Sequence, residues 1–367
     1  MATQITNYQC PACTGPLQFS PETGKLKCEY CESVYEPADI EALYQAKEEA
    51  AAAAAAQNTG DTKWDTGNLN SDWGETAAEL KTYSCPSCCA ELICDASTAA
   101  TSCPYCGNPT IVPGQFSGAL KPDFIIPFKM DKDAAVAALK KHYKGKFFLP
   151  KAFSDQNHIQ QIQGVYVPFW LYDGEAAGTA SYNATVVRRM KRGDYEITKT
   201  DHFYVSRAGS IGFEKVPVDA STKMPDGHMD SIEPFDYSEL KPFSTAYLPG
   251  FLADKYDQSA DDCSQRADTR CEQTLENELA KTVVGYATVV NTGKNLHLKR
   301  GKVHYALLPV WMLNTKWQGK DFLFAMNGQT GRMVGDLPVD RKKFWGTLFG
   351  LTAALSVISS ALIMLLQ

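Results

Sequence analysis

The sequence is poor in the residues and motifs on which most enzyme active sites depend. Its six histidines are scattered without the spacing of metal ligands, and they are His142, His158, His202, His228, His297 and His304. The phosphate-binding pattern GxxxxGK[ST], the dinucleotide pattern GxGxxG, the protease motif HExxH and the esterase motif GxSxG are all missing. We therefore expect a protein that is not an enzyme.

Arginine is absent from the first 113 residues, and lysine is scarce there. This stretch holds 5 Lys against 15 Asp and Glu, a net charge of −10, whereas residues 114–367 hold 31 Lys and Arg against 27 acidic residues, a net charge of +4. Nucleic acids are bound largely through basic side chains that neutralise phosphates. The acidic stretch is therefore a poor surface for DNA or RNA. The 44% of hydrophobic residues excludes a disordered chain.

An export signal is also missing, because residues 1–7 contain neither a basic nor an apolar stretch. We therefore expect the twelve cysteines to lie in a reducing cytosol. Clustered cysteines in that compartment bind metal or carry out chemistry more often than they form disulfides. Ten of the twelve lie in the acidic first third of the chain.

An internal repeat organises these cysteines. The motif Tyr8-x-Cys10-Pro11-x-Cys13 recurs 75 residues later as Tyr83-x-Cys85-Pro86-x-Cys88, and 14 residues after each of them comes a second CxxC. Two CxxC turns on adjacent hairpins bring four sulfurs to one point, which is the tetrahedral arrangement of a zinc ribbon. Four thiolates leave no open position, so both zinc ions would be structural. The predicted ligands are Cys10, Cys13, Cys28 and Cys31 in the first site and Cys85, Cys88, Cys103 and Cys106 in the second.

Other interpretations of the cysteines stay open. The same ligands would hold rubredoxin-type iron. A CxxC is also a thioredoxin-like redox motif, although no βαβ pattern surrounds either pair. Gly107 permits the positive φ that a metal-binding turn often needs. Cys89 and Cys94 are expected as small buried residues or as competing ligands, and no role is predicted for Cys263 and Cys271.

Zinc binding makes the N-terminal region more acidic, since eight thiolates against two Zn²⁺ change its charge from −10 to about −14. A membrane-tethered nucleic-acid-binding zinc-ribbon protein is therefore the second hypothesis rather than the first. Two basic runs, 188–192 and 294–302, are expected at hairpin turns, where solvated charge explains them and lipid headgroups are the next candidate. A hydrolase or transferase hidden in residues 114–340 is the third hypothesis.

The sequence predicts an α+β chain of five parts. Residues 1–36 and 81–113 are expected as two small β zinc ribbons. Residues 37–80 would join them as a helical spacer and flexible linker, because seven consecutive alanines favour a helix. Residues 114–340 would form a mostly antiparallel α+β body, and residues 341–367 a C-terminal transmembrane anchor.

Three local patterns stand out in the body. Residues 131–143 have the spacing of an amphipathic helix with Asp131 near its start. The continuous apolar run 164–172 predicts a buried strand. Asn327-Gly328 lies between two short apolar runs, where this dipeptide favours a two-residue hairpin turn over a phosphate-binding loop.

The last apolar run is the longest. Residues 344–366 contain no charge and no proline, and 23 residues of helix at ~1.5 Å each would span a bilayer. Arg341-Lys342-Lys343 precedes it, which predicts a single-pass cell-membrane protein with cytoplasmic N-terminal domains. A hydrophobic core helix is the alternative. Gly346 and Gly350 form a GxxxG that permits a homo-dimer.

Together these elements resemble the bacterial TFIIB-type double zinc-ribbon membrane proteins, whose genes lie beside genes for SPFH-domain proteins and often for a phage-shock protein A homologue. The resemblance covers nearly the whole chain. It is carried by the paired ribbons, the terminal apolar segment and the runs KPDFIIPF (121–128), QGVYVPFW (163–170), YALLPVW (305–311) and NGQTG (327–331). The chain departs from the family at Cys89, where the second ribbon usually has glycine.

The resemblance implies a tail-anchored membrane adaptor. Such a protein would recruit an SPFH-domain partner, and with it a phage-shock protein A homologue, to the bacterial membrane in envelope stress or maintenance. Proteins of this kind are sometimes labelled as primosomal helicases, but this chain has no nucleotide-binding loop. The expected partners are therefore proteins and membrane lipid, and not nucleic acid.

Overall fold

The computed structural model describes residues 8, 10–12, 17–21, 23–28, 30–57, 63–74, 77, 80–95, 97–98, 102–109, 111–115, 120–151, 153 and 161–366. The chain forms two compact units, each assembled from three separate stretches. The first unit comprises Met1–Asp65, Tyr172–Val216 and Ser264–Lys302, and the second comprises Thr66–Leu171, Pro217–Cys263 and Val303–Gln367. Each unit has a hydrophobic core of its own.

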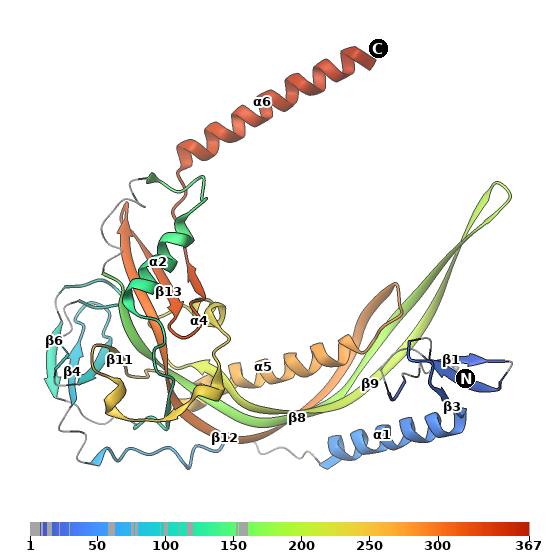
Figure 1. Ribbon diagram of the computed structural model, residues 1–367, viewed down its shortest axis with the longest axis horizontal. Coiled ribbons are helices and arrows are strands. Elements are labelled where there is room, and N and C mark those ends of the chain that lie inside the picture. Colours follow the sequence, from blue (N-terminus) through green and yellow to red (C-terminus); the bar gives the residue numbers. More distant parts are fainter. Residues whose placement is uncertain are drawn as a thin grey trace. The chain divides into compact units, whose positions relative to one another are not determined.

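One large mixed sheet of eleven strands dominates the structure (Figure 1). Its order is β10-β7-β12-β8-β11-β5-β4-β6, with β9 beside β8, β13 beside β12 and β14 beside β13. Strand β11 runs parallel to β8 and β12 runs parallel to β7, whereas β5 is antiparallel to both β4 and β11. The strands are β4 (Leu80–Ser84), β5 (Glu91–Asp95), β6 (Val112–Gln115), β7 (Phe124–Ile125), β8 (Gln163–Arg192), β9 (Tyr195–Asp219), β10 (Lys241–Pro242), β11 (Leu252–Asp254), β12 (Thr288–Trp317), β13 (Lys320–Asn327) and β14 (Met333–Gly335).

This sheet corrects the predicted fold class. The α+β prediction of two small zinc ribbons, a mostly antiparallel body and a transmembrane helix is wrong. Strand β5 of the predicted second ribbon pairs with β11, in the register Ala253↔Ile93 and Asp254↔Leu92. The edge of a three-stranded ribbon has unpaired N–H and C=O groups, and β11 pairs with them. Residues 81–113 therefore contribute strands to the large sheet instead of standing alone.

The first unit begins with a small sheet of its own. Its order is β1-β2-β3, with both neighbouring pairs antiparallel. The strands are β1 (Leu17–Ser20), β2 (Lys25–Cys28) and β3 (Val34–Tyr35). Helix α1 (Pro37–Gln57) follows directly and includes the alanine run, as its helix propensity predicts.

The core of the first unit lies between helix α5 (Ala260–Lys281) and the strands of the large sheet. Cys271, Leu275 and Leu279 of α5 pack against buried β8 residues such as Ala180 and Tyr182. Figure 1 shows α5 running alongside these strands. Neighbouring members of this set are four residues apart, which places the three α5 side chains on one helix face.

Two glycines allow the long strands β8 and β12 to approach closely within this unit. A Cβ at Gly178 would lie 2.2 Å from the carbonyl oxygen of Asn295, and a Cβ at Gly301 would lie 2.4 Å from that of Asp173. No side chain fits at such distances, so glycine is required at both positions.

The second unit is built around the apolar run 164–172, which is buried within β8 as predicted. Helix α2 (Lys132–Tyr143) packs its buried residues Ala135, Val136 and Leu139 into a neighbouring cluster. The carboxylate of Asp131 accepts a hydrogen bond from the Ala134 backbone N–H at 2.8 Å, which confirms the predicted helix start. Helix α4 (Asp226–Ile232) completes this unit's core.

A stacked pair of aromatic rings explains two further glycines. Phe128 and Phe251 lie 4.1 Å apart with an interplanar angle of 4°. A Cβ at Gly164 would lie 2.5 Å from Phe251, and one at Gly328 would lie 2.6 Å from Phe128. The β13–β14 hairpin is confirmed, but its turn is longer than predicted, and the positive φ falls at Gly331. Gly328 is therefore needed for packing rather than for the turn.

Helix α6 (Arg341–Leu366) forms over the predicted C-terminal segment. Within the part of the chain that the structure describes, however, no helix is both long and apolar enough to cross a membrane. Hydroxyl side chains interrupt the apolar run, and those of Thr352, Ser356 and Ser360 bond back to carbonyls of the preceding turn. The predicted transmembrane anchor at 344–366, the tail-anchored topology and the cell-membrane location are therefore contradicted.

Candidate metal centre

The second predicted ligand set comes together in the second unit. The Sγ atoms of Cys85, Cys88, Cys103 and Cys106 all lie within 4.8 Å of one another. Cys85 is 3.6 Å from Cys106, and Cys88 is 3.6 Å from Cys103. These four thiols form a cluster that can hold a metal ion. We call it the inner cluster.

Two tight turns of the same form create this geometry. In the first turn the Cys85 N–H donates to the Ala90 carbonyl and the Cys89 N–H donates to the Cys85 carbonyl, both at 2.9 Å. The second turn repeats this pattern from Cys103 to Asn108, with Gly107 in the place of Cys89. Cys89 and Gly107 both have positive φ, +57° and +69°. The predicted backbone of Gly107 is confirmed, and Cys89 adopts the same conformation with an exposed side chain.

Burial and backbone N–H groups set the protonation of the inner cluster. Burial opposes ionisation of Cys85, but hydrogen bonds from the backbone of Cys88 and Ser87 outweigh it and lower the pKa of Cys85 to about 7. Burial raises the pKa of Cys88 to about 11 and that of Cys103 further still. One thiolate therefore forms readily near neutral pH, and a bound metal would displace the remaining protons.

Three ligands of the other predicted set also lie together. The Sγ atoms of Cys10, Cys28 and Cys31 are within 4.8 Å of one another, and this group can also hold a metal ion. Cys13 lies outside the described residues. The Cys31 thiol donates to the Ser33 hydroxyl at 3.2 Å, and the Tyr35 hydroxyl lies 3.5 Å from Cys10. We call this group the outer cluster.

The two clusters differ in their surroundings. Cys85 and Cys103 are buried in the main hydrophobic core of the second unit, beside Leu92, Val165 and Val167. The outer cluster lies on the small sheet of the first unit, where Cys31 is exposed. The inner cluster is therefore part of the main core of the second unit, whereas the outer cluster lies on a small sheet.

A buried hydrogen-bond network joins the inner cluster to the rest of its unit. The hydroxyl of Tyr105, which lies between Cys103 and Cys106, donates to a carboxylate oxygen of Asp254 at 2.6 Å, and Ser221 donates to the same oxygen at 2.7 Å. The other oxygen of Asp254 is buried without a hydrogen-bond partner among the described residues. Burial raises the pKa of Asp254 to about 7. Sequence reasoning missed this network because Tyr105 and Asp254 are 149 residues apart.

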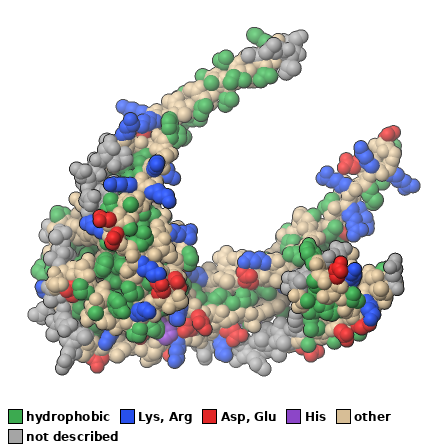
Figure 2. Space-filling view, in the orientation of Figure 1, with side chains coloured by type: hydrophobic (Ala, Val, Ile, Leu, Met, Phe, Trp, Pro, Cys, Tyr) green, Lys and Arg blue, Asp and Glu red, His purple; other side chains and the backbone are tan. Residues whose placement is uncertain are grey.

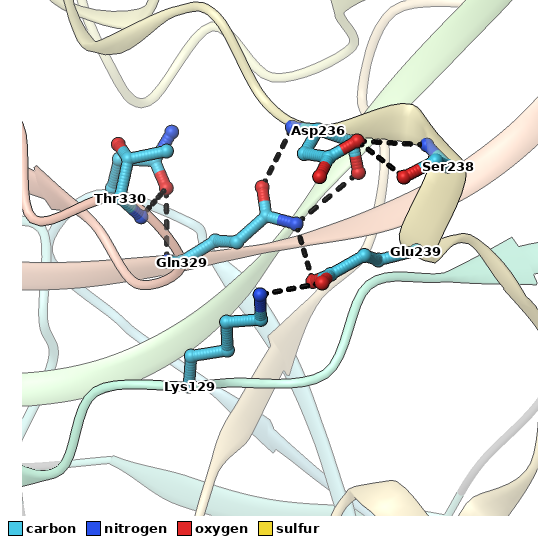
Figure 3. A network of polar contacts seen from close by, with 7 residues as sticks. Lys129, Asp236, Ser238, Glu239, Gln329 and Thr330 are labelled. Carbon is cyan, nitrogen blue, oxygen red and sulfur yellow. Dashed lines mark hydrogen bonds and ion pairs between the residues drawn. The ribbon is translucent and has the colours of Figure 1, made fainter.

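A second polar network surrounds the predicted hairpin turn (Figure 3). The side-chain amide of Gln329 donates to Glu239 at 2.8 Å and to the Asp236 carbonyl at 3.1 Å, and it accepts from the Asp236 N–H at 2.7 Å. Lys129 pairs with Glu239 at 2.5 Å. Through these contacts Gln329 holds the loop of residues 236–239 against the turn. Nothing in the sequence indicated this role of Gln329.

The remaining cysteines have separate positions. Cys94 is buried, as predicted, and its thiol donates to the Thr98 carbonyl at 3.4 Å. The prediction of a buried side chain at Cys89 is wrong. Cys263 and Cys271 are both buried in α5.

Comparison with known proteins gives one informative result. The uncharacterized protein YdjG of Bacillus subtilis (strain 168) is 36% identical over 359 residues, which cover 97% of this chain and 98% of the relative. No family model matches the chain. No solved structure matches it with significance.

The unequal surroundings of the clusters predict unequal effects of cysteine substitution. Cys103→Ser is expected to lower the free energy of unfolding of the second unit by roughly 4 kcal/mol if the inner cluster holds a metal ion, because it removes one of the four converging thiols from that unit's core. Cys28→Ser, the matched control, should leave that transition unchanged. Denaturant unfolding followed by tryptophan fluorescence measures both. Equal losses of stability in the two variants would contradict the distinction.

The raised pKa of Asp254 predicts a pH-dependent stability. Its carboxyl group keeps a proton up to about pH 7 in the folded chain, whereas in the unfolded chain it ionises near the ordinary value of 3.8. The folded state binds more protons in this window, so stability falls as pH rises from 3.8 toward 7 and is level above it, a loss of up to about 4 kcal/mol. Asp254→Asn should flatten the upper part of this profile in denaturant unfolding. An unchanged slope in the variant would contradict the assignment.

Proposed function

Since the chain belongs to the same family as the YdjG protein of Bacillus subtilis, with which it aligns over 97% of its length, we propose one function for the whole chain. It is a non-enzymatic adaptor that holds two structural zinc ions and recruits protein partners. The observation that carries this proposal is the inner cluster, in which four thiols converge within the core of the second unit.

Zinc is the metal that suits these ligands best. Four cysteine thiolates form a closed tetrahedral site, in which Zn²⁺ has no position left for water or substrate. Such an ion stabilises the surrounding fold and carries out no chemistry. The outer cluster would hold the second ion with Cys10, Cys28 and Cys31, together with the predicted ligand Cys13. Iron is the competing metal for the same ligands.

The charge of the N-terminal region supports a protein partner over a nucleic acid. Residues 1–113 carry −10 before metal binding, and an acidic surface repels a phosphate backbone. We propose that this region binds an SPFH-domain protein, with a phage-shock protein A homologue as a further partner. The resemblance of the paired CxxC motifs and the Pro-aromatic runs to the adaptor family supports this choice.

Helix α6 supports a homo-dimer as part of the same proposal. Its large apolar side chains are exposed, among them Phe349, Leu355 and Val357. A Cβ at Gly346 or Gly350 would meet no atom within 4 Å, so this stretch of the helix is open to a second copy. Small residues four apart allow two helices to approach closely.

Metal analysis tests the zinc assignment. The purified chain should contain about two zinc ions, and a Cys10→Ser/Cys13→Ser variant and a Cys85→Ser/Cys88→Ser variant should each lose about one. Elemental analysis measures the metal, and the visible absorption of a rubredoxin-type centre would reveal iron instead. Folded protein that contains no metal would contradict the assignment.

Crosslinking in cells tests the adaptor proposal. Mass spectrometry of crosslinked, detergent-purified protein should recover an SPFH-domain protein together with chain-to-chain crosslinks in α6. Gly346→Ile/Gly350→Ile should remove the chain-to-chain crosslinks, because the added side chains hold the helices apart, and should leave the partner bound. Recovery of nucleic acid without either protein contact would overturn the proposal.

A further inference from the structure

The hairpin formed by the end of β8 and the start of β9 is exposed on both faces. Every residue from 187 to 200 is exposed, and a two-residue turn, Gly193–Asp194, joins the strands. We call residues 187–200 the arm. Because these side chains are exposed, they contribute little to the packing of the chain, and two isolated strands are only marginally stable in water. The composition of the arm indicates instead that it binds a partner.

The arm is strongly basic at its end. It contains Arg188, Arg189, Lys191, Arg192 and Lys199 against two acidic residues, a net charge of +3. Figure 2 shows the lysine and arginine side chains gathered at the end of this hairpin. Lys199 pairs with Asp201 at 2.9 Å. Among the described residues, the other four cations have no ion pair.

Large apolar side chains lie among these cations. Tyr195 is 77% exposed, Met190 is 52% exposed and Ile197 is 42% exposed. The two-residue turn places Arg192 opposite Tyr195 and Met190 opposite Ile197, and alternate residues of a strand share a face. One face of the arm therefore combines three apolar side chains with Arg188, Arg192 and Lys199.

We propose that the arm binds the surface of an anionic phospholipid bilayer. The guanidinium and ammonium groups would contact lipid phosphates, and the three apolar side chains would enter the boundary between headgroups and acyl chains. This binding is peripheral and needs no membrane-spanning helix. It goes beyond the adaptor proposal, because it depends on neither the zinc sites nor the protein partners.

The apolar composition favours lipid over nucleic acid. Met190 and Ile197 are aliphatic, so they gain by leaving water but cannot stack on bases as aromatic rings do. Tyr195 is the single aromatic ring on this face. An anionic bilayer offers phosphates to the basic side chains and an apolar layer to the aliphatic ones. A nucleic acid offers phosphates but no apolar layer.

Vesicle sedimentation with the full chain tests the proposal. The measured quantity is the ratio of affinity for vesicles containing about one-third phosphatidylglycerol to affinity for pure phosphatidylcholine vesicles, so that apolar binding elsewhere in the chain cancels. Arg188→Gln/Arg189→Gln/Lys191→Gln/Arg192→Gln should reduce this ratio about tenfold or more, because each basic side chain near an anionic surface contributes to binding. Met190→Ser/Tyr195→Ser/Ile197→Ser should weaken binding to the anionic vesicles while keeping its salt dependence.

A matched control removes the same charge elsewhere. Lys140→Gln/Lys141→Gln/Lys144→Gln/Lys146→Gln changes four exposed lysines in or after α2 and should leave the ratio unchanged. Circular dichroism and metal content establish that each variant is folded. The proposal is overturned if the wild-type ratio is near one, or if the arm and control variants lose affinity equally. Binding of labelled DNA through the arm without any preference for anionic vesicles would overturn it in favour of a nucleic acid.

Discussion

The pairing of β5 with β11 is the constraint on which the second unit depends. It brings the cysteine turns of residues 85–106 against the main core, because β11 ends at Asp254 and Tyr105 donates its hydroxyl to that carboxyl group. Asn314 of β12 adds a hydrogen bond to the Tyr105 carbonyl. The metal-binding turns are therefore attached through strand pairing and through a buried polar network. A ligand set in this position is part of the folding core and not an appendage to it.

Local patterns predicted local structure well. The CxxC spacing placed four sulfurs together, Asp131 began a helix, and the apolar run 164–172 formed a buried strand. Each of these depends on residues close in sequence, where turn and helix geometry decide which side chains meet. The inner cluster follows the same rule, since each CxxC turn is closed by bonds between residues at most five apart.

The fold class could not be predicted, because it depends on contacts over long sequence separations. Ile93 of β5 pairs with Ala253 of β11, and Phe124 of β7 pairs with Ala306 of β12. No pattern in the neighbouring sequence predicts either pairing. Gly328 shows the same limit at a single residue. Because Asn327 precedes it, the sequence suggested that residue 328 is glycine to form a turn. In the structure, glycine is required there because the ring of Phe128 leaves no space for a Cβ. Composition also predicted a membrane span at 344–366, which the helices of the described chain do not support.

The difference between the two cysteine clusters follows from the same long-range contacts. The repeat makes the two ligand sets look equivalent, because their spacing is the same. Among the described residues, the second hairpin pairs with β11 of the large sheet, and Cys85 and Cys103 are buried in the main core there. The first hairpin lies in a three-stranded sheet, in which the hydroxyl groups of Tyr35 and Ser33 lie near the thiols of Cys10 and Cys31. Metal at the inner cluster would therefore stabilise a whole unit, whereas metal at the outer cluster would order a small sheet whose exposed thiol stays within reach of solvent.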